Sequence, residues 1–159
     1  MATVNMIQGG SVAGLAWTPS AQPGIVSVRL RGADAATTKG SALAASDVIQ
    51  VLTIPAGTVL AGATLYVRTA DTGTTLTMDL GDGTAADEWV DGVDATATGY
   101  AAQGTNGIFD QRKLYTSADT LKLTLATLSS ANDDWEVEVL AQFVDYSGNP
   151  RARAAKDNP

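Results

Sequence analysis

The segment of residues 47–80 constrains the fold most, because apolar stretches alternate there with turn signals. The stretches are 47–54, 63–69 and 75–80, and the residues between them include Pro55, Gly57 and Gly73. Short strands with turn signals about every ten residues are typical of an all-β sandwich or barrel. We therefore expect three consecutive strands here, within an all-β domain.

Other segments add strands to this prediction. Residues 25–31 alternate, and the buried face is expected to hold Ile25 or Val26, followed by Val28 and Leu30. A short strand is expected at 86–91, carrying Trp89, and residues 108–109 and 113–115 are expected to form a short edge strand. The last two strands are expected at 119–125, where Leu121, Leu123 and Leu125 share a face, and at 134–146, where the buried side holds Trp135, Val137, Val139, Ala141 and Phe143. The turn at 129–133 predicts that these two strands form a hairpin.

The connections between the predicted strands differ in length. Residues 32–46 and 92–107 are long and rich in small residues, and a short helix fits at 33–37 or 41–45. Such a mixture favours a single jelly-roll-like, Greek-key β-sandwich over an up-and-down barrel. We place the sandwich at residues 24–146, between an extended N-terminal arm of residues 1–23 and a C-terminal tail of residues 147–159.

Composition excludes several classes of function. The 159 residues include no histidine and no cysteine, which removes Ser-His-Asp catalysis, thiolate metal sites and disulfides. Residues 1–150 hold seven basic and sixteen acidic residues, a balance that should repel nucleic acid. No apolar run approaches the ~18 residues of a membrane span. The N-terminus shows no secretory signal, so we expect synthesis in a cytoplasm, with neither nucleic acid nor membrane as partner.

Two acidic features invite a chemical interpretation. Residues 71–74, Asp-Thr-Gly-Thr, match the short signature of aspartic proteases, but that chemistry needs two facing carboxylates and the motif falls where a hairpin must turn. Six carboxylates crowd residues 79–94, where calcium is the alternative to a solvated loop, although the spacing is not that of an EF-hand. Paired carboxylates for glycoside hydrolysis lack the aromatic residues that such sites use to stack sugars. We therefore expect no enzymatic activity and no cofactor.

The order of strands and turns resembles that of small virion proteins of tailed bacteriophages. The segments that carry this resemblance are 47–58, 63–68, 76–83, 117–125 and 135–146, with Tyr100 between them. The resemblance implies a capsid decoration (cement) protein made in the host cytoplasm, which binds the outer surface of the virion. Such a protein forms a jelly-roll-like homotrimer that bridges major capsid protein subunits and stabilises the shell.

The two arms are the predicted partner-binding segments. Leu15 and Trp17 are apolar residues in a Gly- and Pro-punctuated arm, and aromatic anchors commonly dominate interfaces. Arg151 and Arg153 lie in the basic tail, where they could contact the acidic body of a sister subunit.

A carbohydrate- or receptor-binding head of a phage tail or fibre is the alternative function. It predicts exposed aromatic side chains in a groove near Trp89 or Tyr100, whereas decoration predicts buried aromatics.

Overall fold

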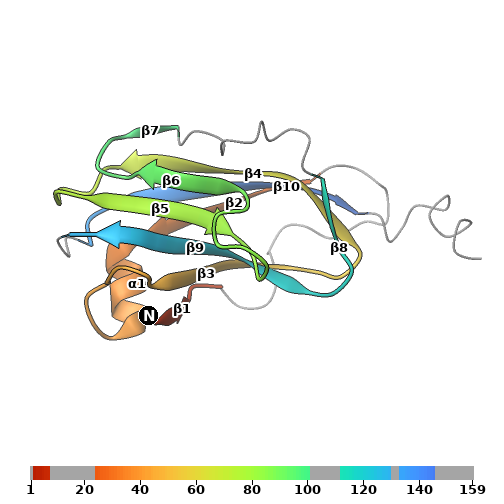
Figure 1. Ribbon diagram of the computed structural model, residues 1–159, viewed down its shortest axis with the longest axis horizontal. Coiled ribbons are helices and arrows are strands. Elements are labelled where there is room, and N and C mark those ends of the chain that lie inside the picture. Colours follow the sequence, from red (N-terminus) through yellow and green to blue (C-terminus); the bar gives the residue numbers. More distant parts are fainter. Residues whose placement is uncertain (1, 8–23, 101–111, 130–132, 146–159) are drawn as a thin grey trace, which may run out of the picture.

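The computed structural model describes residues 2–7, 24–100, 112–129 and 133–145, which form a two-layered β-sandwich (Figure 1). For Tyr100, Val144 and Asp145 only the backbone is described. In chain order the elements are β1 (Thr3–Asn5), β2 (Gly24–Arg31), α1 (Gly32–Lys39), β3 (Val48–Ile54), β4 (Thr58–Thr69), β5 (Leu76–Gly81), β6 (Val90–Asp94), β7 (Gly99–Tyr100), β8 (Lys113–Tyr115), β9 (Asp119–Leu128) and β10 (Glu136–Asp145).

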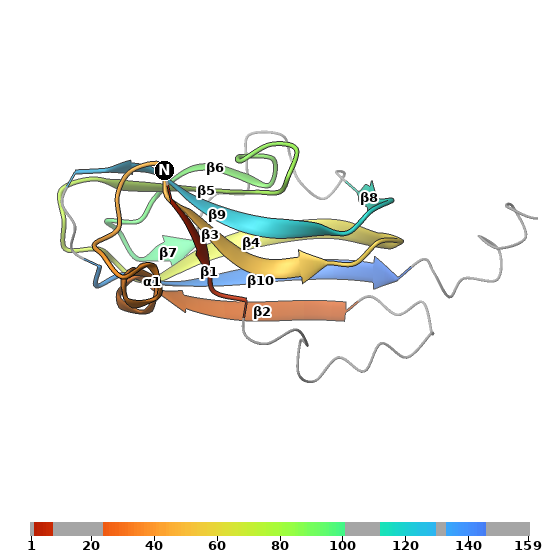
Figure 2. The same ribbon diagram turned by 90° about the horizontal axis from the view of Figure 1, so that it is seen from below.

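The strands form two sheets, which Figure 2 shows as separate layers. The first sheet has the order β1-β3-β9-β5-β6, and the second has the order β2-β10-β4-β7, with β8 also pairing with β4. All pairs are antiparallel except β1 with β3. The predicted all-β sandwich is therefore confirmed. From β2 to β5 each strand lies in the sheet opposite its predecessor. This alternation favours the jelly-roll form of the sandwich, which stays a prediction.

The predicted hairpin of the last two strands is wrong. Strand β9 lies in the first sheet between β3 and β5, whereas β10 lies in the second sheet between β2 and β4. Both strands have an apolar face, and those faces meet across the core instead of lying on one surface. Sequence alternation fixes which face is buried, but it does not say which sheet the strand joins.

The three strands predicted in residues 47–80 are confirmed as β3, β4 and β5. They do not form one meander, because β4 belongs to the second sheet. The turn at residues 71–74 therefore crosses between sheets and does not close a hairpin. Strand β4 also begins at Thr58, earlier than predicted. A register shift opposite Gln142 and Phe143 interrupts the alternation there, as a β-bulge does.

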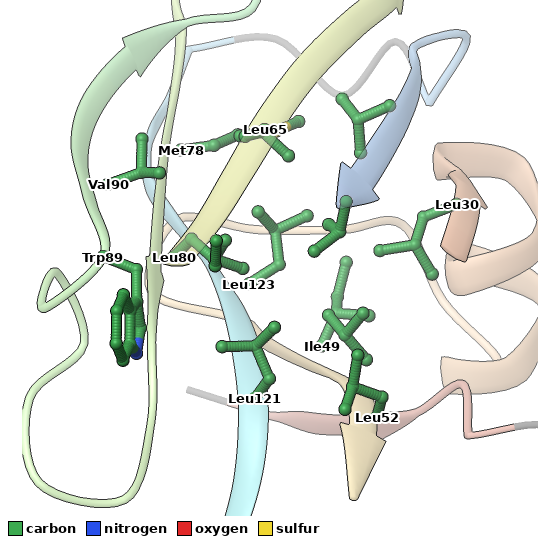
Figure 3. Packing of buried hydrophobic residues seen from close by; sticks show 14 of the residues in the cluster. Leu30, Ile49, Leu52, Leu65, Met78, Leu80, Trp89, Val90, Leu121 and Leu123 are labelled. Atoms are coloured by element: carbon green, nitrogen blue, oxygen red, sulfur yellow. The ribbon is translucent and has the colours of Figure 1, made fainter. Parts of the chain in front are cut away.

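The core lies between the two sheets, where the predicted apolar faces meet (Figure 3). The predicted inward-facing residues of β9 and β10 are all buried, as is Trp135 beside the start of β10. Each large apolar side chain contributes about 1.5–3 kcal/mol through burial. Packing is close around Trp135, since a Cβ atom on Gly32 would lie 2.7 Å from its indole nitrogen. On β2, Leu30 is buried and Val28 is partly buried, as predicted; of the two candidates for the first buried position, Val26 is buried and Ile25 is exposed.

One helix, α1, occupies part of the region predicted as a loop. It overlaps the predicted helical segment 33–37 and is capped at its C-terminus by Gly40, whose φ of 78° is left-handed and suits glycine. Asp34 in its first turn and Lys39 in its last turn have the charges that the helix dipole favours. No helix in the described chain is long and apolar enough to cross a bilayer.

The remaining predicted elements differ in detail. The strand expected at 86–91 is instead β6, and Trp89 lies just before it. Strand β8 forms at residues 113–115 as predicted. The loop expected at 92–107 contains the end of β6 and all of β7, and residues 101–107 lie outside the described chain. The bounds of the arm, sandwich and tail stay predictions, although residues 3–5 of the arm form β1 against β3.

Candidate interaction surfaces

The outer face of the second sheet carries a network of charged side chains. Arg29 and Arg31 of β2 both pair with Glu136 of β10, at 3.4 and 2.9 Å. Glu138, one alternation further along β10, accepts hydrogen bonds from Ser27 of β2 and from Arg68 of β4. These bonds hold the pKa of Glu138 below its usual value. Because the pairs are solvent-exposed, each adds at most about 1 kcal/mol to stability, so the network mainly fixes the charge pattern of this face.

Two large apolar side chains are exposed in the described chain. Ile25 at the start of β2 is 68% exposed, and Leu114 of β8 is 54% exposed. Both belong to the second sheet, since β8 pairs with β4. Single exposed apolar residues are normal on a protein surface.

A buried carboxylate joins β8 to the end of β5. Asp82 accepts hydrogen bonds from Lys113 at 2.7 Å and from the Tyr115 hydroxyl at 2.5 Å, and Lys113 also pairs with Glu88 at 3.1 Å. Burial alone would raise the pKa of Asp82, but the bonds from Lys113 and Tyr115 lower it to about 2. Burial and the neighbouring Asp82 raise the pKa of Tyr115. Because Asp82 follows a strand of the first sheet, this cluster links the two sheets.

A second buried carboxylate holds the N-terminal strand. Asp47 accepts hydrogen bonds from the backbone N–H of Ala2 at 2.8 Å and of Ala44 at 2.9 Å, and it pairs with Lys39 at 2.6 Å. Burial would raise the pKa of Asp47, but the bond from Lys39 and the backbone bonds lower it. Asp47 thus connects α1, β1 and the start of β3.

The protease-like motif forms a turn whose aspartate is buried. Asp71 accepts a hydrogen bond from the Gly73 N–H at 3.0 Å, and Asp134 accepts bonds from the N–H and hydroxyl of Thr72. Burial raises the pKa of Asp71 to about 6, and the hydrogen bond to Asp134 and the nearby negative charges add to this rise. Thr72 holds the pKa of the exposed Asp134 below its usual value. The motif therefore serves the crossing from β4 to β5, as a turn interpretation requires.

The acidic segment 79–94 uses its carboxylates locally. Asp79 accepts the N–H of Gly92 at 2.8 Å, Asp94 accepts the N–H and hydroxyl of Thr96, and Asp82 is paired with Lys113. Within the described residues, no group of three or more acidic, histidine or cysteine side chains is placed to hold a metal ion. The described chain gives the calcium alternative no support.

The predicted partner-binding residues cannot be placed on these surfaces. Leu15, Trp17, Arg151 and Arg153 all lie outside the described residues. The clusters around Asp47 and Asp82 were not predicted. Their members are up to 45 residues apart in sequence, so no local pattern predicts them.

The aromatic residues bear on the alternative function. Trp89 is 1% exposed and its indole lies in the core (Figure 3), and Trp135 and Tyr115 are also buried. The receptor-binding alternative predicts exposed aromatic side chains near Trp89 or Tyr100; Trp89 itself is buried, and the side chain of Tyr100 lies outside the described structure.

The chain matches no protein-family model and no curated protein sequence. Its fold does match solved structures. A chain from the capsid of Ralstonia phage GP4 has a TM-score of 0.61 at 16% identity, over 91% of this chain and 99% of that chain. The fold is one found in phage capsids. A chain of the cyanophage Pam1 capsid asymmetric unit has a TM-score of 0.56 at 19% identity, over 77% of this chain and 83% of that one.

A third match extends this finding. A chain from the acid-stable capsid of Helicobacter pylori bacteriophage KHP30 has a TM-score of 0.54 at 10% identity, over 77% of this chain and 86% of that chain. The predicted resemblance to a phage capsid-related protein is thus confirmed at the level of the fold.

Proposed function

We propose that this chain is a structural virion protein that decorates the outer surface of a phage capsid. As a homotrimer it bridges neighbouring major capsid protein subunits and stabilises the shell without catalysing a reaction. The observation that carries this proposal is the match to a capsid chain over nearly the full length of both chains.

The described surface suits a binding role. The buried carboxylates serve structural contacts: Asp47 holds β1, Asp71 lies in a turn and Asp82 links the sheets. A rigid sandwich repeated over a symmetric lattice can bind by many weak contacts, because each bound copy raises the effective concentration of the next contact. The arms of residues 1–23 and 147–159, with Leu15, Trp17, Arg151 and Arg153, are the proposed contacts to the shell and to sister subunits.

Heating of capsids tests this function. Shells depleted of the protein are heated with and without added purified protein, and rupture is followed by release of DNA or by light scattering. We expect the added protein to sediment with the shells and to raise their rupture temperature. Protein that stays in the supernatant, or shells whose rupture temperature does not change, would contradict the proposal. The matched control is the same protein after it has been unfolded in denaturant and transferred to buffer without refolding.

A further inference from the structure

Each sheet of the sandwich has two end strands, which are β1 and β6 in the first sheet and β2 and β7 in the second. Strand β2 closes the second sheet and pairs along its whole length with β10 alone, and β6 closes the first sheet and pairs with β5 alone, within the described chain. Such edges present backbone donors and acceptors that another chain can pair with.

These two edges lie on opposite sides of the molecule. Helix α1 contacts both β1 and β2, so β2 lies on the side where the first sheet ends in β1. Strand β6 contacts β4 and lies below β7 in the upper part of the sandwich in Figure 1. A contact between the β2 edge of one copy and the β6 edge of another would therefore join different surfaces of the two copies.

The two edges carry opposite charge. On β2, the side chains of Arg29 and Arg31 are 54% and 60% exposed, and the two share the single carboxylate of Glu136. On β6, Asp91 and Asp94 are exposed, and neither forms a salt bridge within the described chain. The nearby Asp79 has a raised pKa, because its burial is reinforced by the negative charges of Asp91 and Asp87.

We propose that copies of this chain associate edge to edge, with β2 of one copy against β6 of the next, so that Arg29 and Arg31 face Asp91 and Asp94. This inference rests on the self-association in the proposed function and names its surfaces. Because the contact joins two different surfaces on opposite sides of each copy, repeating it generates a closed ring only when the rotation between copies closes, and an open row otherwise.

Charge reversal tests the assignment, with sedimentation of the full-length chain as the measurement. Arg31→Asp and Asp91→Arg are each expected to weaken self-association at least about ten-fold, because like charges then face each other across the contact. The double variant Arg31→Asp/Asp91→Arg should recover wild-type association, since the pair is restored with reversed polarity. Lys122→Asp makes the same charge change as Arg31→Asp on the central strand β9, away from both edges, and should leave association unchanged. Circular dichroism establishes that each variant is folded.

The outcomes separate this inference from the proposed function. Wild-type association in both single variants, or failure of the double variant to recover it, would overturn the β2–β6 assignment and leave shell binding intact. An Arg31→Asp variant that associates normally but no longer binds shells would also overturn the assignment, and would place the contact to the capsid subunit at the β2 edge. A wild-type chain that is monomeric at every concentration would overturn the self-association itself. Shell binding is tested separately, by whether the added protein raises the rupture temperature of the shells.

Discussion

Three buried aspartates show how single residues determine the electrostatics of this sandwich. Asp47 and Asp82 each have a lysine partner and several hydrogen bonds, so their pKa values are lowered although they are buried. Asp71 has one backbone N–H donor and acidic neighbours, so its pKa is raised. Asp47 and Asp82 therefore stabilise the fold at neutral pH, whereas Asp71 destabilises it.

Asp71→Asn should make the protein more stable above pH 6. Because the folded state raises the pKa of Asp71 from 3.8 to about 6, its contribution to stability is greatest below pH 4 and is lost as the pH rises through 6. Removing the charge should increase the free energy of unfolding at pH 8 by up to about 3 kcal/mol, and by little at pH 4. Urea unfolding at both pH values measures this. An equal effect of the substitution at the two pH values would contradict the assigned pKa.

Asp82→Asn should have the opposite pH dependence. Since the pKa of Asp82 is lowered to about 2, its contribution is present above pH 4 and is lost as the pH falls towards 2. At pH 7 the substitution should cost about 3 kcal/mol, because it breaks a buried ion pair with Lys113 and leaves that cation with Glu88 alone.

The matched control is Glu88→Gln, which removes the partly exposed partner of the same lysine and should cost less than about 1 kcal/mol. If the two substitutions destabilise the protein equally in urea unfolding at pH 7, the Asp82 cluster does not link the sheets as described.

At the scale of elements, the sequence predicts strand faces better than strand partners. Alternating leucines in β9 and apolar residues in β10 predicted their buried sides correctly, because period-two burial is a local property. The partners of these strands were predicted wrongly, since pairing depends on contacts with β3, β5, β2 and β4 that are distant in sequence. Helix α1 was predicted only in part, as its Ala- and Thr-rich sequence is weakly amphipathic and could equally be a loop.

Glycine positions offer a test of the element boundaries. A Cβ atom on Gly81, at the end of β5, would lie 2.0 Å from the carbonyl oxygen of Ala85, so Gly81→Ala should cost at least about 2 kcal/mol by forcing the backbone apart. Gly62 lies in β4, where an added Cβ meets no atom within 4 Å, and Gly62→Ala should change stability by less than about 0.5 kcal/mol. Thermal unfolding compares the two variants. Similar melting temperatures would mean that the turn after β5 is more open than described.

At the scale of the whole molecule, the sequence predicted a binding protein but not its surfaces. The lack of histidine and cysteine, and the run of short strands, were sufficient to predict a sandwich without Ser-His-Asp or thiolate chemistry. The opposite charges of the β2 and β6 edges could not be predicted, because they depend on which strands end each sheet. The arm and tail residues Leu15, Trp17, Arg151 and Arg153 stay predictions, since they lie outside the described chain.

Imaging of virions by electron cryo-microscopy tests the central claim most directly. The proposed decoration role predicts sandwich-shaped density on the outside of the shell, at the boundaries between major capsid protein subunits, with three copies in contact. The density should be absent from particles made by a phage that lacks the gene for this chain. Shells that look identical with and without the gene, or density confined to the tail or its fibres, would contradict the account.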